Sequence, residues 1–209
     1  MDLHWEILDK QRLVLLPGLR LFKDTFYLAG GTAAALYLGH RDSVDFDFFT
    51  EKEFNHSMVL SQIKEIFTGK KVEESLAQPN TILLKVDDVE MSFFKYPYVA
   101  VGPFFDTENV KLASLADIGC MKLTAISDRH KLRDYIDLYA ICQKVPLKEL
   151  LKKAEIKFPG INSSVFIRSL SYYADIDEDR KLIFKNNFYV DLKTIESFFR
   201  QEIKQLFEI

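Results

Sequence analysis

Hydrophobic and polar residues follow two different periods along the chain, and these periods predict where strands and helices lie. Runs in which apolar residues are continuous or alternate with polar ones predict strands over residues 26–29, 44–49, 71–77, 81–86 and 89–94. Apolar residues at helical spacing predict helices over residues 3–23, 56–67, 114–126, 129–143, 147–155, 162–173 and 191–208. We therefore predict a mixed α+β protein with one mixed sheet of about five strands, helices that flank the sheet, and a C-terminal helical lobe.

The change from strands to helices divides the chain. We assign residues 1–110 to a sheet domain and residues 111–209 to a helical lobe that completes the site. Within the lobe, Ser114 is predicted to cap the first helix. Ser127 and Asp128 are predicted to interrupt that helix and to cap the next one.

Two aspartates occupy one face of the second predicted strand. Asp45 and Asp47 alternate with Val44, Phe46 and Phe48, and a side-chain period of two places both carboxylates on the same face. Adjacent carboxylates on a face that otherwise belongs to the core repel each other and lose hydration unless a cation joins them. Mg²⁺ and Mn²⁺ suit carboxylate oxygens, and Mg²⁺ commonly binds carboxylates together with phosphate oxygens. We therefore predict that Asp45 and Asp47 are catalytic metal ligands.

A glycine pair lies just upstream of these aspartates. Gly30 and Gly31 follow the first predicted strand, and a helix of small residues begins near Thr32 and ends at Gly39. The first turn of a helix leaves backbone N–H groups without intrahelical partners, which favours an anion such as a phosphate. We predict that Gly30, Gly31 and Thr32 bind the phosphates of a nucleotide, with the Thr32 hydroxyl as an additional donor.

One lysine interrupts the apolar pattern of the first helix of the lobe. Lys122 stands between Met121 and Leu123, and an ammonium group in apolar surroundings needs an anion. A triphosphate would supply that anion. The alternatives are that the side chain reaches solvent or pairs with Asp134 or Asp137.

These two segments together resemble the nucleotidyltransferase signature of the AbiEii/AbiGii toxin family, which belongs to the polymerase-beta-like superfamily. The first part of the likeness is Gly30-Gly31-Thr32 followed by Gly39-His40-Arg41-x-Ser43-x-Asp45-x-Asp47-Phe48-Phe49. The second part is Asp117-x4-Lys122-Leu-x-Ala-x3-Arg129-x3-Arg133-Asp134-x2-Asp137-Leu138. The likeness extends from the first predicted strand to the second helix of the lobe, and it implies a polymerase-beta-like nucleotidyltransferase core.

The resemblance implies roles for residues of the lobe. It marks Lys122 as a ligand of the nucleoside triphosphate. It also marks Asp137, or alternatively Asp134, as an acidic residue needed for activity. Arg129 and Arg133 are expected to form ion pairs on the helix face instead of binding the triphosphate.

Three residues between the small-residue helix and the aspartate strand complete the predicted nucleotide site. We expect His40, Arg41 and Ser43 to contact the nucleotide, because they lie within the same signature. A purely structural hydrogen bond is the alternative for His40.

The third acidic position of the superfamily is altered in this chain. Polymerase-beta-like enzymes usually carry a third carboxylate on a neighbouring strand, and aligning Ser92-Phe93-Phe94 with that pattern places Ser92 there. A serine is a poor Mg²⁺ ligand and not a strong base near neutral pH. Glu90, two residues earlier on the same face, is the candidate catalytic replacement. The alternative for Glu90 is a solvated strand residue.

Charge and hydrophobicity limit the cellular location and the binding partners that we expect for this protein. The formal net charge is −3, so no overall basic field attracts nucleic acid, and an RNA contact needs a local patch. No apolar run approaches the ~18 residues of a membrane span, and the N-terminal residues lack the basic and apolar parts of a secretory signal. We therefore expect a cytoplasmic protein without a membrane partner.

The combined prediction is a Mg²⁺-dependent nucleotidyltransferase that moves a nucleoside monophosphate from a nucleoside triphosphate to an acceptor hydroxyl. Its resemblance implies the toxin of a toxin–antitoxin or abortive-infection system. The implied partners are an acceptor, either RNA such as a tRNA end or a protein, and a cognate antitoxin. Two alternatives stay open: a catalytically silent nucleotide- or partner-binding domain, which Ser92 favours, and an antibiotic-modifying nucleotidyltransferase.

Overall fold

The computed structural model describes residues 2–177 and 182–208, and the strands in these residues form one mixed sheet. The strands are β1 (Tyr27–Ala29), β2 (Phe46–Thr50), β3 (Val72–Gln78), β4 (Thr81–Val86), β5 (Val89–Lys95), β6 (Phe105–Asp106) and β7 (Lys111–Leu112). Their order in space is β3-β4-β5-β2-β1-β7-β6. The central strand β2 is parallel to β5 and antiparallel to β1. The predicted mixed sheet is confirmed; it has 7 strands because the two-residue strands β6 and β7 extend one edge.

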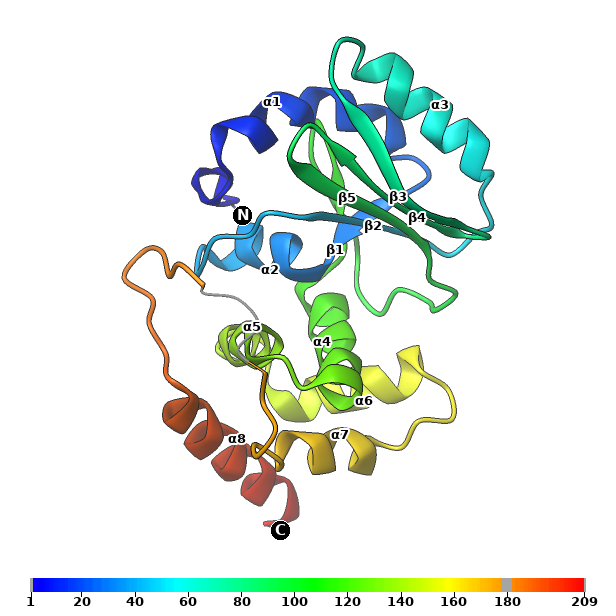
Figure 1. The fold of residues 1–209 in the computed structure, drawn as a ribbon. Helices are drawn as coiled ribbons and strands as arrows, with labels where there is room; N and C mark the ends of the chain where they lie inside the picture. Colours follow the sequence, from blue (N-terminus) through cyan, green and yellow to red (C-terminus); the bar gives the residue numbers. More distant parts are fainter. Residues whose placement is uncertain (1, 178–181, 209) are drawn as a thin grey trace.

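Helices cover both faces of the sheet. The helices are α1 (Lys10–Leu19), α2 (Gly30–Leu38), α3 (His56–Ile66), α4 (Leu115–Arg129), α5 (Leu132–Cys142), α6 (Leu147–Lys157), α7 (Ser163–Leu170) and α8 (Leu192–Phe207). Figure 1 shows α1 and α3 on one side of the sheet, with α2 and the lobe formed by α4 to α8 on the other. The lobe docks through α2, which packs against both α4 and α5. Three fully buried alanines, Ala33, Ala34 and Ala35, allow this close packing.

The N-terminal helix is shorter than predicted. Asp9 caps α1 by accepting a hydrogen bond from the backbone N–H of Arg12, so the helix begins at Lys10 and not near residue 3. Short 3-10 turns, Trp5–Ile7 and Arg20–Phe22, flank it. The cap satisfies a backbone donor that would otherwise be left unpaired, and this fixes the start of the helix.

The predicted helix break at Ser127 and Asp128 is wrong. Helix α4 continues through both residues, because the Ser127 hydroxyl donates to the carbonyl of Leu123 in the preceding turn and so needs no break to find a partner. The break falls at His130, whose φ of 42° is left-handed and whose N–H bonds to the Ile126 carbonyl.

Strand β2 has two different faces. Phe46 and Phe48 are buried, and the Phe48 ring stacks on Phe93 of β5 with centroids 5.0 Å apart. Asp47 and Phe49 alternate with these residues and are only partly buried. The period of two in the sequence therefore separates a phenylalanine core on one side from a polar and aromatic wall on the other.

The predicted division into residues 1–110 and 111–209 stays a prediction. The sheet extends through β7, which ends at Leu112, and α4 begins at Leu115. The chain passes directly from the sheet edge into the first helix of the lobe.

Candidate active site

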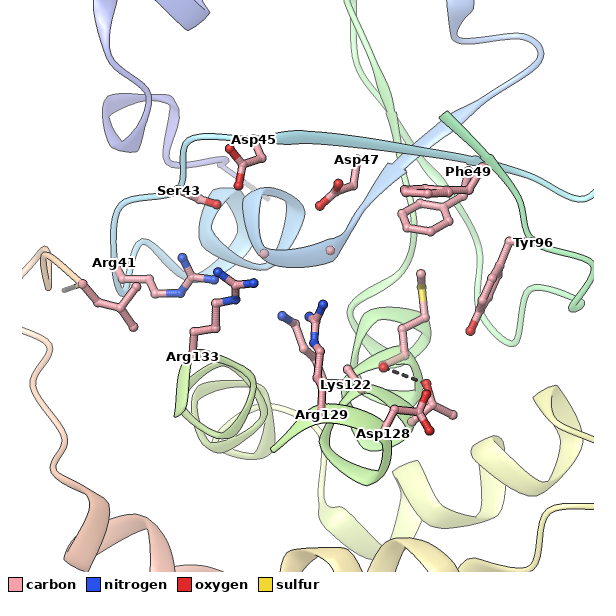
Figure 2. A pocket seen from close by; sticks show the side chains of 17 residues that line it. Arg41, Ser43, Asp45, Asp47, Phe49, Tyr96, Lys122, Asp128, Arg129 and Arg133 are labelled. Atoms are coloured by element: carbon pink, nitrogen blue, oxygen red, sulfur yellow. Dashed lines mark hydrogen bonds between the residues drawn. The ribbon is translucent and has the colours of Figure 1, made fainter. Parts of the chain in front are cut away.

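A cavity of about 390 Å³ opens between the sheet and the helical lobe. Figure 2 shows Asp45 and Asp47 on its upper wall, facing Lys122, Arg129 and Arg133 below. The acidic wall comes from β2 and the residue before it, and the basic wall comes from α4 and α5. The cavity thus has carboxylates and cations on opposite sides, an arrangement that suits a phosphate-bearing ligand with a metal ion.

The surroundings of Asp47 disfavour its charged form. Burial raises the pKa of Asp47, and the negative charge of Asp45 raises it further, although Lys122 acts in the opposite direction. A paired carboxylate site of this kind is stabilised by a cation. No cluster of three or more acidic, histidine or cysteine side chains placed to hold a metal occurs within residues 2–177 and 182–208. Two hard carboxylate ligands nevertheless fit Mg²⁺ or Mn²⁺ when substrate oxygens and water complete the coordination.

The glycine pair brings the backbone of α2 close to these carboxylates. Gly30 has a φ of +68°, and a Cβ atom there would lie 2.7 Å from Asp47 Oδ2. A Cβ atom on Gly31 would lie 2.5 Å from Arg41 Nη2. Helix α2 has no side-chain N-cap hydrogen bond from Ala29. Its first N–H groups therefore lie beside the cavity without a capping side chain, as an anion site requires.

The Thr32 hydroxyl bonds to other groups of the protein, and Thr32 does not line the cavity. Thr32 is buried, with Oγ1 2.8 Å from Ser43 Oγ and a second hydrogen bond to the Asp45 carbonyl. A hydroxyl has one proton, and the carbonyl can only accept, so Thr32 donates to Asp45. This contact ties the segment that carries Asp45 to α2. The side chain that reaches the cavity from this pair is that of Ser43.

Asp137 is the centre of a buried ion network behind the cavity. Its side chain has no exposed surface, and it accepts hydrogen bonds from Arg41 Nε at 2.6 Å, Arg41 Nη2 at 2.7 Å and His40 Nε2 at 2.8 Å. Burial by itself would raise the pKa of Asp137, but the charges of Arg41 and Lys122 and these hydrogen bonds hold the pKa well below its ordinary value. Asp137 is therefore an anion that orients Arg41 at the cavity.

Lys122 belongs both to this network and to the cavity wall. Its ammonium lies 2.7 Å from Asp134 Oδ1 and 2.6 Å from Asp137 Oδ2, so the sequence-based alternative of pairing with one of these aspartates holds for both. Burial alone would lower the pKa of Lys122, but the two carboxylates raise it above its ordinary value. Arg129 Nε also bonds to Asp134, at 2.8 Å. The lysine is charged and fixed before any ligand arrives.

His40 lies away from the cavity. Its ring is buried, Nε2 contacts Asp137, and Nδ1 has no hydrogen-bond partner among the described residues. Burial lowers the pKa of His40 despite the neighbouring carboxylate, so the neutral form with a proton on Nε2 fits this position. The structural hydrogen bond predicted as the alternative for His40 is the contact that the structure contains.

The third acidic position is occupied by serine in space as well as in sequence. Ser92 of β5 is the direct cross-strand partner of Asp47, and a hydrogen bond from Ser92 acts to lower the pKa of Asp47. The structure does not bring Glu90 to the cavity. Its side chain is 55% exposed and pairs with Lys85 Nζ at 2.9 Å. Glu90 shares a strand face with Ser92, but it lies opposite Lys85 in the β4–β5 hairpin, which supplies its partner.

Sequence reasoning missed many of the cavity residues, including Met121, Thr124, Ala125 and Asp128. Arg129 and Arg133 also line the cavity, and Arg129 forms an ion pair with Asp134 as well. An aromatic wall was also missed, and it consists of Phe49, Phe94 and Tyr96. The period of two could have indicated Phe49, since it follows Asp47 on the same face of β2.

Comparisons with known proteins agree with this geometry. A family model described as "Nucleotidyl transferase AbiEii toxin, Type IV TA system" matches residues 15–184. The chain belongs to this family. It is accordingly an enzyme that transfers nucleotidyl groups, and the family resemblance inferred from the sequence is confirmed.

Several known proteins are similar to this AbiEii family member over most of its length. An uncharacterised protein of Aquifex aeolicus (strain VF5), aq_aa25, is 34% identical over 195 residues, which cover 88% of this chain and 89% of that protein. Among solved structures, MenT4, a nucleotidyltransferase toxin from Mycobacterium tuberculosis H37Rv, superposes with a TM-score of 0.59 at 14% identity, covering 94% of this chain and 82% of that one. JHP933 from Helicobacter pylori gives a TM-score of 0.56 at 18% identity, covering 98% and 95%. These structural likenesses establish a shared fold.

The helices of this family member also bear on the membrane prediction. Among residues 2–177 and 182–208, each helix is too short or too polar to cross a lipid bilayer.

Proposed function

We propose that this chain is a divalent-metal-dependent toxin that moves a nucleoside monophosphate from a nucleoside triphosphate to an acceptor hydroxyl in the cytoplasm. One observation carries the proposal. Asp45 and Asp47 lie beside the start of α2 and face, across one cavity, a wall of basic side chains. Phosphoryl-type transfer needs little covalent chemistry from the protein, so positioning and charge stabilisation at such a site suffice.

Asp45 and Asp47 would hold the metal ion. When bound, Mg²⁺ or Mn²⁺ would act as a Lewis acid that offsets charge on the phosphate oxygens. The two carboxylates lie on one short segment whose backbone is fixed by the Thr32 hydroxyl and by pairing of β2 with β1 and β5. Ligands fixed in this way need no rearrangement before binding.

The phosphates would be held by the start of α2, beside the aspartates, and by basic side chains. Backbone N–H groups of Gly30 and Gly31 supply neutral donors, and Arg41 supplies a guanidinium oriented by Asp137. Lys122 sits across from the aspartates and would offset the charge that develops on the pyrophosphate leaving group.

The acceptor hydroxyl would attack the α-phosphorus in line with the departing pyrophosphate, and its proton would pass to solvent or to a substrate oxygen. No third carboxylate is assigned as a base, because Ser92 stands opposite Asp47 and Glu90 points elsewhere. Catalysis then depends on orientation of the two substrates and on the preformed charges of the site.

The acceptor that we favour is RNA, such as a tRNA end, with a protein hydroxyl as the alternative. The net charge is −3, but Lys122, Arg129 and Arg133 gather on one wall of the cavity. Two of them are already paired with Asp134, and together they are the local basic groups that an RNA end would contact. The same wall disfavours an antibiotic-modifying role, because a cationic drug would meet like charges. The type IV toxin–antitoxin description of the family supports a cognate antitoxin as partner.

The test is nucleotidyl transfer by purified protein. We would incubate it with Mg²⁺, each α-labelled nucleoside triphosphate and either total RNA or cell lysate. Asp47→Asn should lose label transfer by about 100-fold or more, because it removes one anionic ligand while keeping the side-chain shape. Glu73→Gln is the matched control, since Glu73 is an exposed carboxylate on β3 that pairs with Lys71. Equal transfer by Asp47→Asn and wild type would contradict the metal-site assignment.

The second candidate function is a catalytically silent nucleotide-binding domain, and Ser92 in the third acidic position favours it. The same experiment separates the two functions. Tight binding of a magnesium–nucleotide complex without label transfer or pyrophosphate release, for every nucleotide and acceptor tested, would establish the silent domain.

A further inference from the structure

We propose that Phe49, Phe94 and Tyr96 form a stacking wall for the base of the bound nucleoside triphosphate. The inference rests on the proposed function, because it gives a role to the part of the same cavity that has no phosphate-binding groups. All three rings line the cavity, and Figure 2 shows Phe49 and Tyr96 at the end opposite Arg41. The cavity therefore has a charged end and an aromatic end.

Strand pairing places these rings beside the metal-binding aspartates. Phe49 follows Asp47 by two residues on the same face of β2, and Phe94 is the cross-strand partner of Phe49 on β5. The backbone N–H of Tyr96 bonds to the Thr50 carbonyl at 2.7 Å, which continues the same edge. The three rings thus form one surface continuous with the acidic wall.

The exposure of these rings distinguishes them from the core. Phenylalanines on the opposite face of the same strands, Phe46 and Phe93, are 0% exposed. Phe49, Phe94 and Tyr96 are all only partly buried and border open space. Aromatic surface gathered in a cavity, rather than packed in the core, is characteristic of a ligand site.

The rings are fixed before a ligand binds. Phe49 contacts Phe94 with centroids 5.5 Å apart at an interplanar angle of 31°, and it contacts Tyr96 edge-on, also at 5.5 Å. Behind them, Tyr27 stacks on Phe49 at 6.0 Å. Side chains held by their neighbours lose little rotamer freedom on binding, so the free energy of stacking is retained as affinity.

Helix α4 forms the wall of the cavity that faces the three aromatic rings. Met121, Thr124 and Ala125 line the cavity at positions i, i+3 and i+4 of the helix, so they share one face. A methionine thioether makes favourable contacts with aromatic rings. A flat base between this helix face and the aromatic wall would be covered on both sides.

The spacing along β2 fits a nucleotide that bridges the two ends. Phe49 lies two positions after Asp47, which is about 7 Å along the strand. One sugar separates the α-phosphate of a nucleotide from its base, and a sugar spans a comparable distance. With the α-phosphate at the aspartates, the base of the same nucleotide therefore reaches the aromatic rings. Stacking on rings accepts every base, because each base has a π face.

The test compares two ligands that differ by the nucleoside. We would measure the Kd of the α,β-methylene analogue of ATP, which the enzyme cannot cleave, and of inorganic tripolyphosphate, both with Mg²⁺ and without an acceptor. Phe94→Leu keeps an apolar side chain but removes the flat ring. It should weaken binding of the analogue about tenfold and leave tripolyphosphate binding unchanged. Phe94→Tyr should restore the affinity.

The controls separate stacking from folding. Phe105→Leu removes a partly buried ring of β6 that does not line the cavity, and it should change neither Kd. Thermal unfolding checks each variant, and Tyr96→Leu replaces Phe94→Leu if the latter is unfolded.

Two results would overturn the inference. The first is an unchanged Kd for the analogue in Phe94→Leu; if the KM for the RNA acceptor is then higher, the rings contact the acceptor base instead. The second is an equal loss of affinity for both ligands. These results leave the proposed function standing. If wild-type protein binds neither ligand, the proposed function fails together with the inference.

Discussion

Gly30 shows at the scale of a single residue how the site constrains the sequence. Its left-handed φ of +68° turns the chain from β1 into α2, and its missing side chain leaves room for Asp47 Oδ2. A left-handed conformation costs an L-residue about 1–2 kcal/mol. The close approach adds a second, local reason for glycine, because a methyl group would push the carboxylate out of position.

Gly30→Ala should separate these two effects when it is compared with Gly69→Ala. Gly69 also has a left-handed φ, +86°, but a Cβ atom there would meet nothing within 4 Å. Both variants should lose about 1–2 kcal/mol of unfolding free energy in urea. Only Gly30→Ala should also lose nucleotidyl transfer, measured with labelled nucleotide. Full activity of folded Gly30→Ala would show that Asp47 does not need its observed position.

At the scale of elements, the ion network joins α4, α5 and the segment after α2. Lys122 of α4 contacts two carboxylates of α5, and Arg41 contacts one of them, Asp137. Removing one partner from a buried ion network leaves uncompensated charge, which is costly in a low-dielectric interior. The network therefore sets the distance between the sheet side and the lobe side of the cavity.

Lys122→Ala should lower the unfolding free energy by about 3–5 kcal/mol, because Asp134 and Asp137 would lose a shared counter-charge. Chemical denaturation monitored by circular dichroism measures the loss. The double variant Lys122→Met, Asp134→Asn removes a cation and an anion together and should recover part of it. An unchanged denaturation midpoint for Lys122→Ala, with nucleotide affinity reduced, would mean that the lysine acts only as a ligand.

At the scale of the whole molecule, two buried groups make stability depend on pH in the same direction. Burial lowers the pKa of His40, so the unfolded chain takes up a proton that the folded protein resists as pH falls below about 6.5. The pKa of Asp137 is held well below its ordinary value, so protonation of the unfolded chain adds to the loss below about pH 4. At each of these two groups the unfolded state binds more protons, and their contribution to the unfolding free energy therefore decreases with falling pH.

His40→Gln should flatten the first part of this dependence. Glutamine can place an N–H near the position of His40 Nε2 and still donate to Asp137, but it does not titrate. Between about pH 6.5 and pH 5, the unfolding free energy of wild type should fall more steeply than that of the variant, by at most about 1.4 kcal/mol per pH unit. Urea unfolding at a series of pH values measures both slopes. Parallel slopes would show that His40 does not contribute.

Local sequence was enough for the parts of the protein that depend on local geometry. The alternation around Asp45 and Asp47 predicted that both face one side, and both line the cavity, although Asp45 lies one residue before β2 begins. The turn at Gly30 and Gly31 likewise follows from the conformational freedom of glycine. The mixed sheet and the helical lobe were predicted from the same periods.

Tertiary structure decided which distant side chains meet. Arg41 and Asp137 are 96 positions apart in the chain, and no period relates them. Glu90 lies on the same strand face as Ser92, but the β4–β5 register places it opposite Lys85, with which it forms an ion pair. The aromatic end of the cavity likewise exists because β5 lies beside β2. Sequence period determines which way a side chain points relative to its own element, whereas the partner it finds depends on how separate elements pack.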